Sequence, residues 1–209
     1  MNPRIQQRAA ALQAPQPVAA YVFDALATEG PLKRHAAALI AWDVATQVMA
    51  SSAWAVCRAL QLDSTALSRH AASLREPSFA TWIGLLREGV RLTAGVKEPE
   101  AAALARLSGG LRSPWAGRLD VNAVRELLTE VPEPIGVPGR AVVDMIQAMP
   151  TYWSRTHGVE HAPFTDEDYA RHASTLLLGL IDFAENTPLA GEFRWVHVRR
   201  LDRSAGDVI

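Results

Sequence analysis

The sequence lacks the features that mark disulfide scaffolds, P-loop enzymes and common hydrolases. Its 209 residues contain one cysteine, so no intramolecular disulfide can form. It has no glycine-rich phosphate loop, no serine or cysteine nucleophile motif and no internal repeat. The formal net charge of -1 supplies no overall field that would hold a polyanion. Nucleic-acid binding would therefore require a local basic patch.

The chain also lacks an apolar run that fits a secretory signal or a membrane span. Residues 1–16 contain two arginines and no continuous apolar stretch, which favours a flexible N-terminal arm. The apolar run 36–57 carries polar residues about four positions apart, which is typical of a buried core helix with one polar stripe. Cys57 ends this run and is expected to be a small buried side chain. We expect a cytoplasmic protein that does not bind membranes.

Helical periodicity dominates residues 17–190. The pattern predicts a helix over 17–27 and one long helix, or two nearly collinear ones, over 32–60. Ser78 is expected to cap a strongly amphipathic helix that begins at residue 79. The sequence therefore predicts an all-α fold, an up-down helical bundle over residues 17–190.

The last two helices of this bundle are expected to pack antiparallel. Apolar residues recur at helical spacing over 142–149, and Thr165 with Asp168 resembles a capping box that starts the final helix. The packing would bring together Val142, Met145 and Met149 with Leu177, Leu180 and Phe183.

After residue 193 the period changes from helical to alternating. Phe193 and Trp195 would share one face, and Arg194 and Val196 the other, which indicates a strand. Residues 191–209 are thus predicted to form a short C-terminal β-strand or hairpin, or the start of a truncated following domain.

Chemically active side chains concentrate at the corner between the last two helices. Residues 152–163 contain an arginine, two histidines and a glutamate, and Pro150, Gly158 and Pro163 are expected to interrupt the helix around them. A purely structural interpretation is also open. Arg155 and His157 would then complement the negative end of the helix dipole, and His161 would bond a nearby carbonyl.

Arg155 and His161, separated by five residues, resemble the R-x(4–6)-H signature of the HEPN superfamily. These small helical domains occur in bacterial toxins, abortive-infection proteins and RNA-cleaving effectors, with the motif near the junction of the two closing helices. Residues 77–88 also resemble a helical element of bacterial HEPN-like modules, so the resemblance spans roughly 77–189. In the superfamily two protomers form one cleft, and the RNA's own 2′-hydroxyl drives cleavage without a metal.

The resemblance implies a bacterial defence or stress-response protein, of the toxin or antiviral type, that acts as a metal-independent endoribonuclease. Arg155 would hold the scissile phosphate and His161 would move protons, with Thr156, His157 and Glu160 in the binding surface. It further implies RNA as a partner without DNA specificity, a homodimer or a partner protein or domain, and no cofactor.

Two positions depart from the pattern of active members. Thr156 follows the arginine where many members have Asn, Asp or His, and Ala162 follows the histidine where they often have Gly. The alternative is therefore a non-catalytic helical dimerisation or regulatory interaction module.

The same corner also fits the H-x-x-E-H motif of inverted zinc proteases, over residues 157–161. That motif needs both histidines on one helical face, and Gly158 and Pro163 argue against a continuous helix. We therefore expect no metal site.

Three other histidines follow an arginine and are expected on solvated helix faces: His35, His70 and His172. Three tryptophans are expected to be core anchors: Trp42, Trp54 and Trp82.

Overall fold

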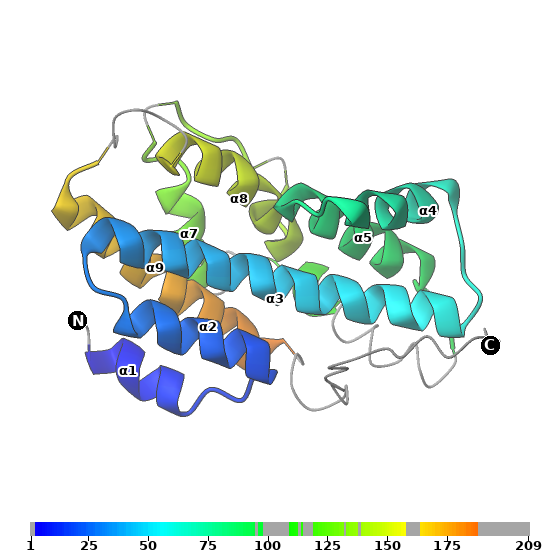
Figure 1. The fold of residues 1–209 in the computed structure, drawn as a ribbon, viewed down its shortest axis with the longest axis horizontal. Helices are drawn as coiled ribbons and strands as arrows, with labels where there is room; N and C mark the ends of the chain where they lie inside the picture. Colours follow the sequence, from blue (N-terminus) through cyan, green and yellow to red (C-terminus); the bar gives the residue numbers. More distant parts are fainter. Residues whose placement is uncertain are drawn as a thin grey trace.

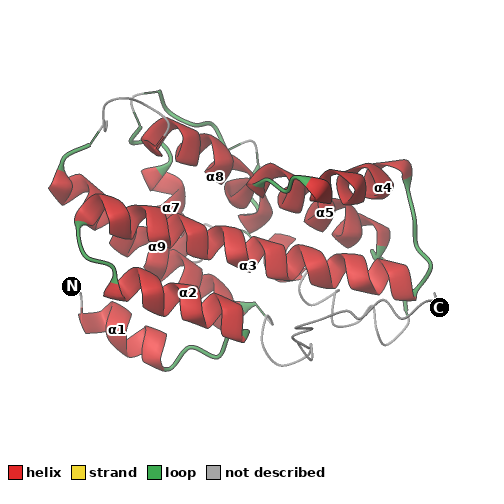
Figure 2. Cartoon of the chain, in the orientation of Figure 1, coloured by secondary structure: helices red, strands yellow, loops and turns green. Residues whose placement is uncertain are grey.

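The computed structural model describes residues 3–94, 96–97, 109–112, 114, 119–131, 133–137, 139–157 and 164–187. In these ranges the fold is all-α, as the periodicity predicts, and it contains one isolated β-bridge and no strand. Figure 2 shows helices joined by loops. The helices are α1 (Pro3–Ala10), α2 (Gln16–Ala27), α3 (Pro31–Ala59), α4 (Thr65–Ala72), the 3₁₀ turn η1 (Ser73–Arg75), α5 (Phe79–Leu92), α7 (Leu119–Leu127), α8 (Val142–His157) and α9 (Asp166–Asn186).

Helix α3 runs along the length of the molecule, and α2, α5 and α9 all pack against it. Figure 1 shows α1 and α2 below it and α8, α4 and α5 above it. The helix follows Gly30, whose φ of 85° suits glycine, and Pro31 takes the first helical position, where its missing N–H costs nothing. The long helix predicted over 32–60 is therefore confirmed as one continuous element.

The polar stripe of α3 also follows the prediction. Asp43, Gln47 and Ser51 are half-buried, whereas Cys57 is fully buried. The amide of Gln47 donates a hydrogen bond to the Asp43 carboxylate at 3.0 Å. None of the helices in the described ranges combines the length and the apolar character that crossing a bilayer requires.

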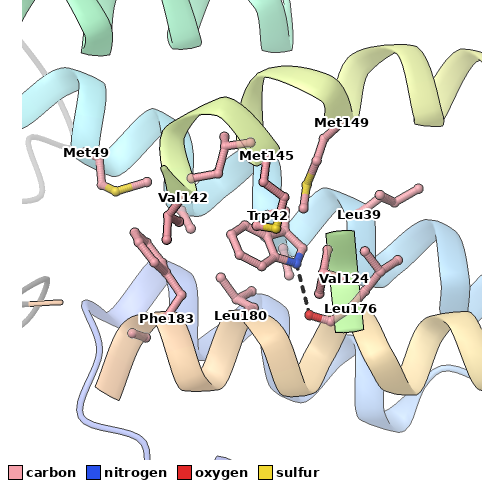
Figure 3. Packing of buried hydrophobic residues seen from close by; sticks show 14 of the residues in the cluster. Leu39, Trp42, Met49, Val124, Val142, Met145, Met149, Leu176, Leu180 and Phe183 are labelled. Atoms are coloured by element: carbon pink, nitrogen blue, oxygen red, sulfur yellow. Dashed lines mark hydrogen bonds between the residues drawn. The ribbon is translucent and has the colours of Figure 1, made fainter. Parts of the chain in front are cut away.

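The core is centred on Trp42, which is fully buried. Its indole N–H donates to the carbonyl of Leu176 at 2.9 Å, which ties α3 to α9. Figure 3 shows Met145 and Met149 of α8 above the indole and Leu180 of α9 below it. The side chains predicted to meet thus share one core, but Trp42 lies between the two helices.

This arrangement changes the predicted partners of the last helix. Helix α9 packs mainly against α3 and α7 and not directly along α8. Gly179 allows the close approach of α7, because a Cβ at this position would overlap the side chain of Val124 and stand 3.2 Å from the carbonyl of Asp120. Trp54 and Trp82 are half-buried and pack against the edge of the core.

Two helix starts confirm the predicted capping residues. The hydroxyl of Ser78 accepts a hydrogen bond from the N–H of Thr81 at 3.1 Å, and that of Thr165 accepts from the N–H of Asp168 at 3.2 Å. In each case the later side chain returns a bond to the cap residue, which completes a capping box. The second cap fixes the start of α9 directly after the polar corner.

The N-terminal residues differ from the expected flexible arm. Residues 3–10 form α1, because Ile5 and Ala9, four positions apart, are buried in the core. Arg8 anchors the helix through ion pairs with Asp120 at 2.5 Å and with Glu185 at 2.6 Å. The predicted C-terminal β element, residues 191–209, lies outside the described residues.

Candidate functional site

The predicted corner begins at the last turn of α8. Of the five residues predicted for the site, the structure places Arg155, Thr156 and His157, whereas Glu160 and His161 lie outside the described residues. The three placed side chains point in different directions. Arg155 is half-exposed, while the side chain of Thr156 is buried and donates back to the carbonyl of Tyr152 at 2.9 Å.

Arg155 reaches away from its own helix toward the loop that precedes α8. Its guanidinium donates to the backbone carbonyl of Glu133 and lies 3.3 Å from the Glu133 carboxylate. Because the Glu133 side chain is 83% exposed, this ion pair is open to solvent and contributes about 0–1 kcal/mol. An anionic ligand can therefore replace the carboxylate at little cost.

His157 is half-buried, and its ring packs against two other rings. Its ring stacks between Trp153, at a centroid distance of 5.0 Å, and His35, at 5.1 Å. Burial lowers the pKa of His157, so the ring is neutral near pH 7. The structure thus gives the ring of His157 packing contacts on α8 and α3, and its predicted binding role stays a prediction.

The stacked ring of His35 belongs to a buried polar network that the sequence interpretation missed. His35 and His172 are fully buried, which corrects their prediction as solvated residues. The hydroxyl of Tyr152 lies between them, 2.8 Å from His35 Nε2 and 3.1 Å from His172 Nδ1. His172 Nε2 in turn lies 3.1 Å from the carboxylate of Glu130. The network joins α3, α8 and α9 to the turn after α7.

Glu130 and Arg171 form the charged end of this network. Two bonds from Arg171, at 2.6 and 3.1 Å, lower the pKa of Glu130, so its carboxylate is ionised and only accepts. His172 Nε2 lies 3.1 Å from this carboxylate and also 3.1 Å from the Arg171 guanidinium, which only donates. Either ring nitrogen of His172 can therefore carry the proton, and the hydroxyl of Tyr152 accepts from one histidine and donates to the other. Among the described residues, His35 Nδ1 has no hydrogen-bond partner.

The stacked histidines do not form a metal site. A ring nitrogen binds a metal in the plane of its ring, and the rings of His35 and His157 are parallel to within 6° at a centroid distance of 5.1 Å. Their lone pairs cannot converge on one ion in this arrangement. Among the described residues no three His, Cys, Asp or Glu side chains are placed to hold a metal ion.

Burial instead keeps the inner members of this network, His35, Tyr152 and His172, as neutral groups that fasten the helices. It lowers the pKa of His35 from 6.5 to about 3, with smaller contributions from the neighbouring His157 and His172, and it raises the pKa of Tyr152. The hydroxyl of Tyr169 donates to the carbonyl of Thr156 at 3.2 Å. The last turn of α8, which carries Arg155, is therefore held from two neighbouring helices.

The sequence did contain a signal for the buried histidines. His35 precedes Leu39, Trp42 and Met49 on one helical face, and His172 follows Tyr169 and precedes Leu176 in the same way.

No family model matches this sequence, and no curated protein or solved structure matches it.

Proposed function

We propose that this chain is a HEPN-like helical domain of a bacterial defence or stress-response protein, and that its α8–α9 corner is a metal-independent endoribonuclease site. The observation that carries the proposal is the position of Arg155. Its half-exposed guanidinium projects from a fixed helix end, is engaged by a solvent-open carboxylate, and directly precedes the segment that contains His161.

Each residue has a defined task in this reaction. The 2′-hydroxyl of the RNA attacks the adjacent phosphorus, the bond to the 5′-oxygen of the next nucleotide breaks, and a 2′,3′-cyclic phosphate and a 5′-hydroxyl result. Arg155 neutralises the phosphate oxygens through forked, charge-assisted hydrogen bonds. His161 accepts the proton of the 2′-hydroxyl, and the protonated imidazole then protonates the leaving oxygen.

The buried network supports this site by positioning Arg155. Tyr152, Thr156 and His157 lie on the last two turns of α8 and bond or stack with residues of α3 and α9. A rigid helix end reduces the entropy that a phosphate-binding side chain loses on binding. His157 is thus a positioning residue, and its removal should act through the fold.

The test compares cleavage of a 5′-labelled single-stranded RNA by four proteins in the presence of a chelator. We expect Arg155→Ala and His161→Ala each to lower the rate by about 10²–10⁴-fold. Glu133→Gln removes only the competing carboxylate, so it should cleave at least as fast as the unmodified protein. Circular dichroism checks that each variant folds.

A mixing experiment tests whether two protomers share the site. In a composite cleft, a mixture of Arg155→Ala and His161→Ala chains contains heterodimers with one intact arginine and one intact histidine, so part of the activity should return. Equal cleavage by both single variants and the unmodified protein would contradict the enzymatic proposal.

The second candidate is a non-catalytic dimerisation or regulatory interaction module. It is favoured by four exposed apolar side chains on α2 and α3, which are 38–48% exposed: Tyr21, Phe23, Leu32 and Ile40. This candidate would be supported if the unmodified protein self-associates but never cleaves RNA, and if Phe23→Ser or Ile40→Ser abolishes the self-association.

A further inference from the structure

A polar pocket of about 440 Å³ lies between α4, α5 and α8. Figure 1 shows these three helices grouped along the upper side of α3. The ring of His70 lies where a Cβ of residue 84 would stand, so only glycine at this position lets α4 bring its histidine over α5. The polar side chains that line the pocket are His70, Arg87, Glu88, Gln147 and Thr151.

A second hollow of about 170 Å³ adjoins this pocket and shares Arg87 with it. Arg91, one turn further along α5, and Arg112, from the helical turn 109–112, also line it. Three arginines thus line the two adjoining hollows on a chain whose formal net charge is -1. This is the kind of local basic patch that binding a polyanion requires.

The acidic side chain that lines this patch is already engaged. Glu88 is the one acid among the described residues that line the two hollows. Arg91 holds its carboxylate at 2.6 and 2.8 Å, and the hydroxyl of Ser64 donates to it at 2.5 Å. With three arginines and one glutamate, the patch keeps a formal charge of about +2 at neutral pH.

The pocket and Arg155 share helix α8. Gln147, Thr151 and Arg155 follow one another at intervals of four residues, so they form one slowly drifting stripe along the helix. The axial distance from the first to the last is roughly 12 Å. A stacked nucleotide strand covers this distance in about three to four nucleotides, at roughly 3.4 Å each.

We propose that these two hollows bind single-stranded RNA next to the Arg155 corner: Arg87, Arg91 and Arg112 bind backbone phosphates, and the polar pocket receives one unstacked base. The choice of RNA as the ligand rests on the proposed function. The contacts themselves are independent of cleavage, because they involve none of the residues that would carry out the reaction.

The chemistry of the pocket favours a single strand over a duplex. The amide of Gln147 and the hydroxyl of Thr151 both donate and accept, as reading a base edge requires. Arg87 bonds to the Gln147 oxygen across the pocket wall and so holds this amide in place. The volume of the pocket lies in the range of small-molecule sites, and a base must be unstacked to enter it.

The experiment measures binding of a fluorescent single-stranded 2′-O-methyl RNA, which lacks the attacking hydroxyl, by anisotropy at a series of salt concentrations. For single strands each phosphate contact contributes about -0.7 to the slope of log K against log salt. The double variant Arg91→Ala/Arg112→Ala should therefore flatten the slope by about 1.4. The matched control Arg4→Ala/Lys33→Ala removes two cationic side chains from α1 and α3 and should leave the slope unchanged.

Two further arms test the pocket. Gln147→Leu, which keeps the side-chain volume, should weaken binding of the single strand severalfold without changing the salt slope. A duplex of the same sequence should bind more weakly than the single strand. Equal affinity for both forms, or equal slopes for the two double variants, would overturn the inference.

These outcomes separate the inference from the proposed function. If Arg91→Ala/Arg112→Ala flattens the slope while unmodified protein never cleaves RNA, the binding surface stands and the endoribonuclease proposal fails. If cleavage depends on Arg155 and His161 but binding ignores the arginine patch, the endoribonuclease proposal stands and this inference fails.

Discussion

His35 should make the stability of the protein depend on pH in a predictable way. Burial lowers its folded-state pKa from 6.5 to about 3, so the unfolded chain takes up this proton first as the pH falls. The free energy of unfolding therefore has its full value above pH 6.5 and decreases as the pH falls toward 3. His157 and His172, whose pKa values burial also lowers, act in the same direction.

The size of this effect follows from the two pKa values. His35 is fully buried, so solvent does not screen the difference. Between pH 7.5 and pH 5.0 its proton linkage alone should lower the free energy of unfolding by about 2 kcal/mol, and by about 5 kcal/mol once the pH lies below both values. The variant His35→Gln keeps an amide that can donate to or accept from the hydroxyl of Tyr152 and cannot titrate, so it should lack this contribution.

The assay is urea unfolding, followed by circular dichroism, of the unmodified protein and of His35→Gln at pH 7.5, 6.0 and 5.0. The variant is expected to be less stable at pH 7.5, because its packing against His157 is lost. The difference in the free energy of unfolding between the two proteins should then be smaller by about 2 kcal/mol at pH 5.0 than at pH 7.5. A gap that stays constant with pH would refute the argument that His35 is neutral and buried in the fold.

Three further substitutions probe the bundle. Leu180→Ala should lower the free energy of unfolding by about 2–5 kcal/mol in urea titration, because the side chain is fully buried beside Trp42. Gly179→Ala should destabilise by about 1 kcal/mol or more despite the better helix propensity of alanine, since its Cβ would overlap Val124; a gain in thermal midpoint would contradict this packing. Thr165→Ala should cost about 1 kcal/mol by loss of the α9 cap, and an unchanged midpoint would show that the cap does not limit stability.

The local features of the fold were predictable because they depend on neighbours in the sequence. The helix starts at Ser78 and Thr165 follow from side chains that bond three residues ahead. The long helix α3 follows from an apolar period that runs without interruption from Leu32. Both kinds of signal lie within a few turns of the chain.

The arrangement of the helices was less predictable because it depends on residues far apart in the chain. His35 and Tyr152 form their hydrogen bond across 117 positions, and nothing close to His35 in the sequence marks such a partner. The position of Trp42 between α8 and α9 likewise depends on the size of its indole. Pattern alone assigned the right side chains to this core but the wrong helix as neighbour.

The positions of the candidate site residues were predictable only in part. Arg155 lies half-exposed on the last turn of α8, where the sequence places it, whereas the periodicity did not show that His157 packs against Trp153 and His35. An i to i+2 step on a helix turns the side chain by about 200°, so the two residues of this turn face opposite sides. This geometry explains why Arg155 reaches Glu133 in the loop before α8 whereas His157 contacts Trp153 and His35.

The central claim, that this corner cleaves RNA through the 2′-hydroxyl, is tested most directly by the products of a single-ribose substrate. A DNA oligonucleotide that contains a single ribonucleotide, incubated with the protein and a chelator, should be cut only on the 3′ side of that ribonucleotide. The 5′ fragment should end in a 2′,3′-cyclic phosphate. The same oligonucleotide should remain intact with Arg155→Ala. Cleavage at deoxyribose positions, cleavage that stops in chelator, or no cleavage by the unmodified protein would contradict the account.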